Sequence, residues 1–356
     1  MRQWRVWAWW GWLVAQAGAV ALSLVLFWQR GSLLTNLALW PVKMVAGTAV
    51  NFLFFSHVVT AVLGLRQRRA WLGGLGAGLA LLMGRYLYVI TRVTAPFTAV
   101  FGQNWEADIP PYMRENWLRR RWYLHLPAPA PTHRQRDVVY GQSAAGQPLT
   151  ANLWQPRPGA PRSGLALVNV HGGAWVYGQK NGDLAYLLQR LAAQGHVVLD
   201  IDYSKYPAVN LVGMVREVQQ ALAWLKVGAG GHIPQLPEKL ALLGTSAGGH
   251  VALLAAYAAQ EPAFRPLDPA LAGVDTAVCG LIAYYPPSDL RMLNAYVQTY
   301  YGASRQETIV PRTENLIIWN INRHLAAEGS AQTIPPGWGN FIPALVCGTP
   351  QETPEL

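Results

Sequence analysis

An uncharged apolar run near the N-terminus is the feature that most restricts how this chain can fold. It extends over twenty-two residues, from Trp7 to Trp28, and about 20 apolar residues are enough for a helix to cross a bilayer. Two further apolar runs follow at 44–65 and 71–90. The sequence therefore predicts a membrane anchor over 1–95, with about three transmembrane helices, one in each run.

The alternative for the first run is a cleaved signal peptide, whose apolar region should be only about 7 to 15 residues long. The length of the run and the two runs behind it favour a retained span. The third run contains Arg85, which costs about 3 kcal/mol in mid-membrane unless it faces a helix or water. Gly74 and Gly78 offer a small-residue face for helix contact. One interpretation of Arg85 and His57 is a functional polar pair inside the membrane. The preferred interpretation is a structural role for each residue.

Charge is distributed unevenly along the chain. Residues 1–100 contain nine Lys or Arg and no Asp or Glu, and these cations are spread singly or in small groups between and within long apolar runs. A nucleic-acid binder would instead group them on one folded face, so we expect no nucleic-acid partner. Five arginines on one side of the predicted spans against three cations on the other favour a cytoplasmic N-terminus. The five are Arg2, Arg5, Arg66, Arg68 and Arg69; the three are Arg30, Lys43 and Arg92.

Three crossings then predict that everything after the anchor lies on the non-cytoplasmic side of an inner or plasma membrane. Residues 96–135 are rich in Trp, Arg and Pro, which is typical of an interfacial segment followed by a stiff linker. We therefore expect the second domain to occupy 136–356.

Short apolar runs alternate with helical patterns in this second domain. Strands that are apolar on both faces and separated by helices predict an α/β fold with a doubly wound, mostly parallel sheet. The expected strands are 165–170, 197–203, 240–244 and 281–285, and the expected helices are 184–194, 211–226 and 248–260.

The pentapeptide from Gly244 to Gly248 matches G-x-S-x-G between an expected strand and an expected helix. A sharp turn at this place projects a serine from the sheet, and the flanking glycines keep side chains away from the turn. Ser246 is therefore the candidate nucleophile, with the Ala247 amide facing the place where an oxyanion would form. The alternative is a small-residue helix cap with an inert serine.

A second motif, HGGAW, begins at His171 directly after an expected strand. Consecutive glycines let backbone amides approach a substrate carbonyl, as an oxyanion hole requires. Gly172 and Gly173 are the candidate donors, and Ala174 is a further one. His171 is expected to order the loop and not to act as the base, because the base should follow the acid along the chain.

Together, HGGAW, LDIDYSKYP, EVQQALAWLK, GTSAGGHVALLAA and YYPPSDL resemble the esterase and lipase branch of the α/β-hydrolase superfamily, near hormone-sensitive-lipase-like and feruloyl-esterase-like carboxylesterases. The resemblance covers 137–290. It implies serine-dependent hydrolysis of carboxylic esters without a cofactor, with Ser246 as nucleophile. Glu217 stands where similar sequences often have Asp, at a structural helix position.

The acid and base of a catalytic triad are not identifiable in the sequence. Only His250 and His324 follow Ser246, and neither stands behind the apolar run that normally precedes a catalytic histidine. We therefore expect the chain to be C-terminally incomplete, with the last strands of the sheet missing. Asp289 with His324, or Glu352 as the acid, are less favoured alternatives.

The expected function is a membrane-anchored serine hydrolase that acts on small acyl esters near the lipid bilayer. The alternatives are a catalytically impaired binding or membrane-organising protein and a serine peptidase. No metal is expected, because the eight histidines show no HExxH or paired Cys/His spacing. The two cysteines, Cys279 and Cys347, fit no disulfide scaffold. The oligomeric state cannot be predicted from these patterns.

Overall fold

The structure is a computed structural model that describes residues 2–28, 33–92, 97–120, 123, 125–182, 184–293 and 345. Its contacts divide the chain into two compact units. The first contains residues 1–106 and 118–127, and the second contains residues 107–117 and 128–356.

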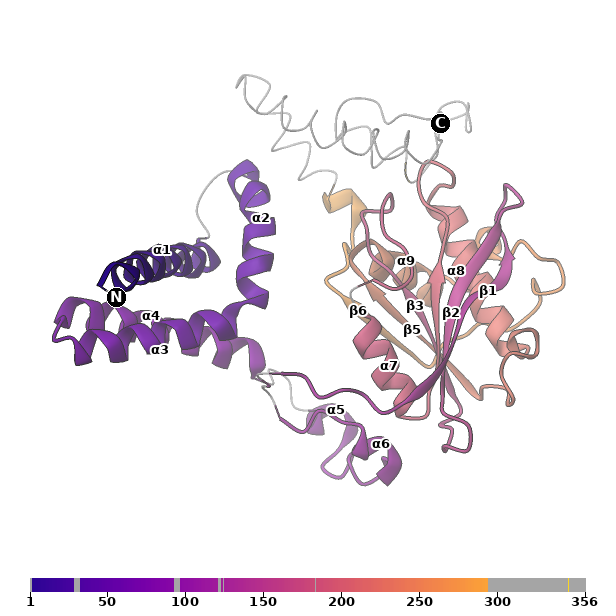
Figure 1. The fold of residues 1–356 in the computed structure, drawn as a ribbon. Helices are drawn as coiled ribbons and strands as arrows, with labels where there is room; N and C mark the ends of the chain where they lie inside the picture. The colour runs from indigo at the N-terminus through magenta and orange to yellow at the C-terminus, as the bar shows by residue number, and fades with distance from the viewer. Residues whose placement is uncertain are drawn as a thin grey trace, which may run out of the picture. The chain divides into compact units, whose positions relative to one another are not determined.

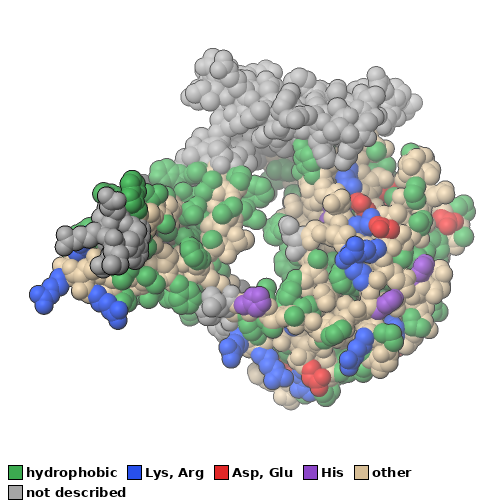
Figure 2. Space-filling model, viewed as in Figure 1, with side chains coloured by type: hydrophobic (Ala, Val, Ile, Leu, Met, Phe, Trp, Pro, Cys, Tyr) green, Lys and Arg blue, Asp and Glu red, His purple; other side chains and the backbone are tan. Residues whose placement is uncertain are grey.

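The first unit is helical. It contains α1 (Arg2–Phe27), α2 (Leu33–Thr48), α3 (Val50–Arg66), α4 (Ala70–Thr91) and the short α5 (Thr98–Phe101) (Figure 1). Figure 2 shows hydrophobic side chains over much of its visible surface, and Trp10, Phe52 and Leu81 are among the exposed ones. This is the surface that a bilayer requires of a helical unit.

Two windows of the described helices, Trp10–Phe27 and Ala70–Thr91, are long and apolar enough to cross a membrane. A third span results if the end of α2 and all of α3 count as one broken span, because they pass the same test together. They are bent by 71° at the break between Thr48 and Val50. The run predicted at 44–65 is therefore not one straight helix, while α1 and α4 cover the other two predicted runs.

Glycine allows α3 and α4 to form a tight hairpin. A Cβ at Gly76 would overlap the backbone of Ala61, and a Cβ at Gly64 would overlap the backbone of Gly73. Gly74 and Gly78, the pair that the sequence suggested for helix contact, have open space where their Cβ atoms would be. The prediction found a small-residue contact in the correct helix but on the wrong face.

Polar side chains join α1 to α3 inside the first unit. The buried Ser23 hydroxyl lies 2.9 Å from His57 Nε2. Gln16 bonds Ser56 at 2.9 Å and accepts the Thr60 hydroxyl at 2.8 Å. His57 is thus partnered by a serine of α1, while the Arg85 side chain is exposed. The structural role that we preferred for His57 agrees with this contact.

The second unit is built on one mixed sheet of six described strands in the order β1-β2-β4-β3-β5-β6. The last four strands in this order are parallel, and β2 is antiparallel to both β1 and β4. The strands are β1 (Thr132–Gln142), β2 (Pro148–Pro156), β3 (Leu165–Val170), β4 (Val197–Asp202), β5 (Lys239–Thr245) and β6 (Gly280–Tyr284). The α/β architecture with a mostly parallel sheet is confirmed.

Helices cover both faces of this sheet (Figure 1). The larger hydrophobic core packs α8 (Leu211–Lys226) and α9 (Ser246–Tyr257) against one face, and the smaller core packs α7 (Ala185–Ala193) against the other. The Asn210 side chain accepts the Gly213 amide at 3.0 Å and so caps α8. The layers leave β3 and β5 adjacent in the middle of the sheet, where both motif turns begin.

Part of the segment predicted as interfacial belongs to the second unit. Asn116, directly after the short α6 (Pro111–Glu115), contacts α7. Arg190 Nη1 donates to the Asn116 carbonyl at 2.6 Å, and Asn116 Nδ2 donates to the Ala193 carbonyl at 3.0 Å. Residues 107–117 are therefore fastened to the sheet domain and are not a free linker.

Candidate active site

The serine motif forms a strained turn between β5 and α9. Ser246 is the first residue of α9 and has a φ of +49°, an uncommon value for a residue with a side chain. A Cβ at Gly244 would lie 2.6 Å from the Gly248 carbonyl oxygen. A Cβ at Gly248 would overlap the carbonyls of Val170 and His171. The motif glycines are thus required by close backbone contacts, and the Ser246 side chain is half-buried.

The HGGAW loop lies directly against this turn because β3 and β5 are parallel neighbours, with Val170 paired to Gly244. The Gly172 amide donates to Thr245 Oγ1 at 3.0 Å. A Cβ at Gly172 would lie 3.2 Å from Ser246 Cβ and 2.8 Å from the Thr245 carbonyl oxygen. The structure therefore brings the two motifs together, although seventy-five positions separate His171 from Ser246.

The loop then coils through three consecutive residues with positive φ: Gly173 at +138°, Ala174 at +51° and Trp175 at +64°. A side chain at Gly173 would overlap the Tyr177 carbonyl. Within the described residues, no acceptor is recorded for the amides of Gly173 and Ala174. The Ala247 amide lies in the first turn of α9, where amides have no partner within the helix. These three amides are available to a ligand, whereas the Gly172 amide is engaged.

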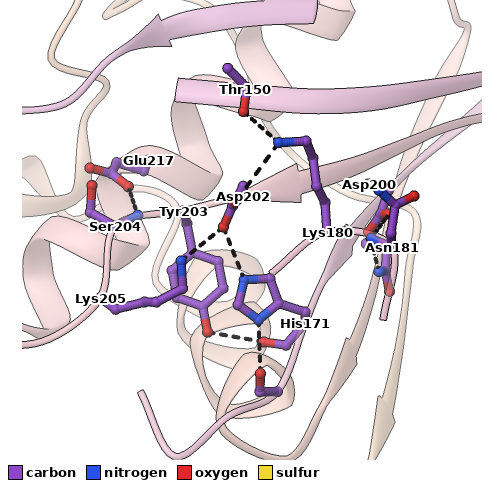
Figure 3. Close-up of polar contacts among 12 residues, drawn as sticks. Thr150, His171, Lys180, Asn181, Asp200, Asp202, Tyr203, Ser204, Lys205 and Glu217 are labelled. Atoms are coloured by element: carbon purple, nitrogen blue, oxygen red, sulfur yellow. Dashed lines mark hydrogen bonds and ion pairs between the residues drawn. The ribbon is translucent and has the colours of Figure 1, made fainter. Parts of the chain in front are cut away.

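His171 is held in place behind this loop. Its Nδ1 lies 2.8 Å from the Gly172 carbonyl oxygen, so that this nitrogen donates, and its Nε2 lies 3.6 Å from Asp202 Oδ1 (Figure 3). The ring stacks on Tyr203 with centroids 4.6 Å apart, and the Tyr203 hydroxyl donates to the His171 carbonyl at 3.0 Å. His171 thus contacts its own loop and β4, as expected of a loop-ordering residue.

Asp202 ends β4 and is surrounded by cations (Figure 3). Lys205 Nζ lies 2.8 Å from Oδ1, and Lys180 Nζ lies 3.7 Å from Oδ2. Burial alone raises the pKa of Asp202, but the contacts with His171 and Lys205 outweigh it and lower this pKa to about 2. Lys180 also bonds Thr150 at 2.7 Å and so connects the cluster to β2.

Glu217 has the opposite electrostatic character. It is buried in α8, and Oε2 accepts the Ser204 amide in the loop after β4, while Oε1 has no partner among the described residues. Burial raises the pKa of Glu217 to about 7, although the Ser204 bonds oppose this shift. Its contact joins a loop to a helix, which fits the structural role predicted from the sequence.

No general base is bonded to Ser246 within the described residues. His250 lies on α9 with its ring edge-on to Trp175, and burial lowers the pKa of His250 to about 4, so it is neutral at pH 7. Asp289 accepts the amides of Arg291 and Met292 at 2.9 and 3.0 Å. The alternative residues His324 and Glu352 lie outside the described residues, as does Cys347.

A cavity of about 500 Å³ lies beyond the C-terminal end of α9, lined by Gln219, Phe264 and Arg265 among others. Ser246 begins this helix, so the cavity and the serine lie at opposite ends of α9. No group of three or more His, Cys, Asp or Glu in the described chain is arranged to hold a metal ion.

Thr245 and Asp202 belong to this site, although no motif in the sequence marks them as site residues. Thr245 occupies the variable second position of G-x-S-x-G, and Asp202 ends a strand that was predicted only for its apolar character. Both residues end strands adjacent to β3, at the edge of the sheet where the HGGAW loop begins, and this adjacency is visible only in the strand order.

A mostly parallel sheet with helices on both faces and a serine turn beside a glycine loop is the arrangement of the α/β-hydrolase fold. The family model described as BD-FAE matches residues 157–318. This part of the chain is therefore similar to the BD-FAE family.

Curated relatives include two esterases of Mycobacterium tuberculosis. Esterase LipQ is 32% identical over 180 residues, which are 48% of this chain and 41% of that protein. Esterase LipC is 29% identical over 246 residues, which are 64% of this chain and 51% of that protein. The matched regions thus span about half or less of these relatives.

Among solved structures, an inhibited esterase B from Lactobacillus rhamnosis is 21% identical with a TM-score of 0.40, over 67% of this chain and 70% of that one.

Proposed function

We propose that this protein is a membrane-anchored serine hydrolase that cleaves carboxylic esters through an acyl-enzyme on Ser246. The observation that carries the proposal is the contact between the serine turn and the glycine loop, with Gly172 bonded to Thr245 at 3.0 Å. This contact holds the glycine loop against the serine turn, and it supports the amides of Gly173, Ala174 and Ala247 as the oxyanion donors. The match to the BD-FAE model and the similarity to mycobacterial esterases support an ester substrate.

In the first half of the reaction, Ser246 Oγ bonds to the ester carbonyl carbon while a general base takes the hydroxyl proton. The carbonyl oxygen becomes an oxyanion and accepts hydrogen bonds from the three free amides. The carbon–oxygen bond to the alcohol then breaks, and the alcohol leaves with the proton. Water attacks the acyl-enzyme in the same way, releases the acid and restores Ser246.

The hydroxyl alone is a weak nucleophile, so this mechanism requires a base that the described residues do not provide. His324 is the candidate base within the sequence. His324→Ala tests this role, because a catalytic histidine predicts a large loss of turnover relative to the unchanged chain.

The test uses the full chain in detergent micelles with p-nitrophenyl butyrate. We expect Ser246→Ala to lower a triad-dependent kcat by on the order of 10⁴ or more. The matched control is Ser288→Ala, an exposed serine, which should retain the starting activity. If folded protein shows no Ser246-dependent turnover, the catalytically impaired binding protein is favoured. Cleavage of Pro-containing peptides without ester hydrolysis would favour the peptidase.

We also propose an odd number of spans, with the N-terminus in the cytoplasm and the hydrolase domain on the other side of the inner or plasma membrane. Whether the bent α2–α3 pair crosses the membrane decides whether the number of spans is odd or even. If this pair crosses, Arg66, Arg68 and Arg69 share the cytoplasmic side with the N-terminus, as the positive-inside rule favours. If the pair is re-entrant, the same three arginines lie outside.

A C-terminal tag tests this topology in spheroplasts. Digestion of the tag by added protease is expected, with a cytoplasmic marker protein remaining intact as the control. A protected tag would contradict the proposed orientation and indicate two crossings.

A further inference from the structure

Both backbone groups of Gly172 are engaged. Its N–H donates to Thr245 Oγ1 at 3.0 Å, and its carbonyl accepts from His171 Nδ1 at 2.8 Å. A trans peptide unit is planar, so its carbonyl and its N–H point in opposite directions. The bond that fixes the Gly172 carbonyl therefore also fixes the direction of the Gly173 amide.

The residues that engage Gly172 come from both sides of its strand. β3 lies between β4 and β5 in the sheet. Thr245 ends β5, and Asp202 ends β4, where its carboxylate faces the second ring nitrogen of His171 at 3.6 Å. Lys205 and Lys180 fix Asp202 in turn, so the contact with His171 is part of a wider ionic network (Figure 3).

We propose that Thr245 and Asp202 are positioning residues of the reaction, which anchor Gly172 from two sides and so present the amides of Gly173 and Ala174 to the substrate carbonyl. Thr245 acts directly on the Gly172 amide, and Asp202 acts through the imidazolium form of His171, in which Nδ1 and Nε2 both carry a proton. This inference rests on the proposed ester hydrolysis for its catalytic meaning. Gly172 then holds the loop in place, and its amide is not one of the oxyanion donors.

The hydrogen bond to Gly172 predicts that the hydroxyl group of Thr245 matters more for the position of the loop than the volume of its side chain. Valine has the same shape as threonine but cannot accept the Gly172 amide, whereas serine can. Thr245→Val should therefore release the loop without emptying the space, and Thr245→Ser should restore the bond. Thr276→Val, at a buried threonine that lines the cavity beyond α9, is the matched control.

In steady-state kinetics with p-nitrophenyl butyrate, we expect Thr245→Val to lower kcat by about 10- to 100-fold, because misplaced oxyanion donors act on the transition state. KM should change little, and Thr245→Ser should recover most of kcat. A purely structural role would lower the amount of folded protein and leave kcat per folded molecule unchanged. That result, or an unchanged kcat in Thr245→Val, would overturn the proposal for Thr245.

A double-mutant cycle tests the shared anchor. We expect Asp202→Asn to lower kcat as Thr245→Val does, with Asp268→Asn as the exposed control. Once either residue has released Gly172, removal of the other should cost little, so the double variant should resemble the weaker single variant. If the two decreases multiply, the residues act on separate elements and the shared anchor is wrong.

Amide hydrogen exchange distinguishes this inference from the proposed function. In Thr245→Val, the amide of Gly172 should lose protection, while peptides from β1 and α7 remain unchanged. If protection at Gly172 is lost but the chain shows no Ser246-dependent turnover, the proposed ester hydrolysis is contradicted. The anchoring of Gly172 by Thr245 is then still supported. Unchanged exchange at Gly172 would contradict the anchor, whatever the activity.

Discussion

Replacement of Gly248 by alanine tests the contact between the two motif turns most directly. The added methyl group would overlap the carbonyls of Val170 and His171. Alanine gains about 1 kcal/mol over glycine in a helix interior, while overpacking of a filled site costs about 1–3 kcal/mol or more. Because backbone atoms and not a flexible side chain occupy the site, we expect the cost to exceed the gain, with a net loss of about 1–2 kcal/mol.

For a domain of this size, each 1 kcal/mol lowers Tm by about 2–4 °C. We therefore expect Gly248→Ala to unfold several degrees below the unchanged chain when the intrinsic fluorescence of the full chain is followed in detergent. A displacement of the loop by about 1 Å would also lower kcat by on the order of 100-fold.

Gly249→Ala is the matched control, because its Cβ would meet the Gly244 carbonyl oxygen and Pro286 Cβ at 3.2 Å. Those neighbours need to move only slightly, so this variant should keep most of its activity. If Gly248→Ala is as stable and as active as Gly249→Ala, the turns do not touch as described and the reasoning fails.

Two further predictions concern other parts of the chain. The pKa of Glu217 is raised from 4.5 to about 7, so its contribution to stability is complete below about pH 4.5 and is lost as pH rises through 7, by on the order of 3 kcal/mol. Glu217→Gln should therefore flatten the decrease of Tm between pH 5 and 8, and an unchanged slope would contradict this prediction. In the helical unit, Gly76→Leu should prevent the α3–α4 hairpin from closing, whereas Gly78→Leu should be tolerated because its Cβ meets open space. Size-exclusion profiles of the two variants in detergent compare them, and equal monodispersity would refute the predicted contact face.

Apolar periodicity predicted the centre of the sheet well. The predicted strand 165–170 coincides with β3, and the strands around it differ only at their ends. These strands are buried on both faces, so their sequences are continuous apolar runs. β1 and β2 were missed, since β1 carries polar residues such as Arg134 and Gln135 along an edge of the sheet, where one side needs no apolar partner.

The candidate site was predictable as far as backbone chemistry determines it. Glycines at fixed offsets indicate close approach, and the structure places Gly172 and Gly248 in such contacts. The engagement of the Gly172 amide was not predictable, because it depends on a side chain from a different strand. Thr245 and Asp202 are ordinary residues in the sequence, and only strand order shows that they flank the same loop.

The cations around Asp202 have a consequence for the surroundings in which the domain can work. A carboxylate whose pKa is about 2 remains ionised through the whole range of acidity that a living cell or its exterior presents. The charge of this carboxylate therefore does not depend on the compartment. A protein facing an acidifying medium would keep this charge while exposed carboxylates elsewhere on its surface became neutral.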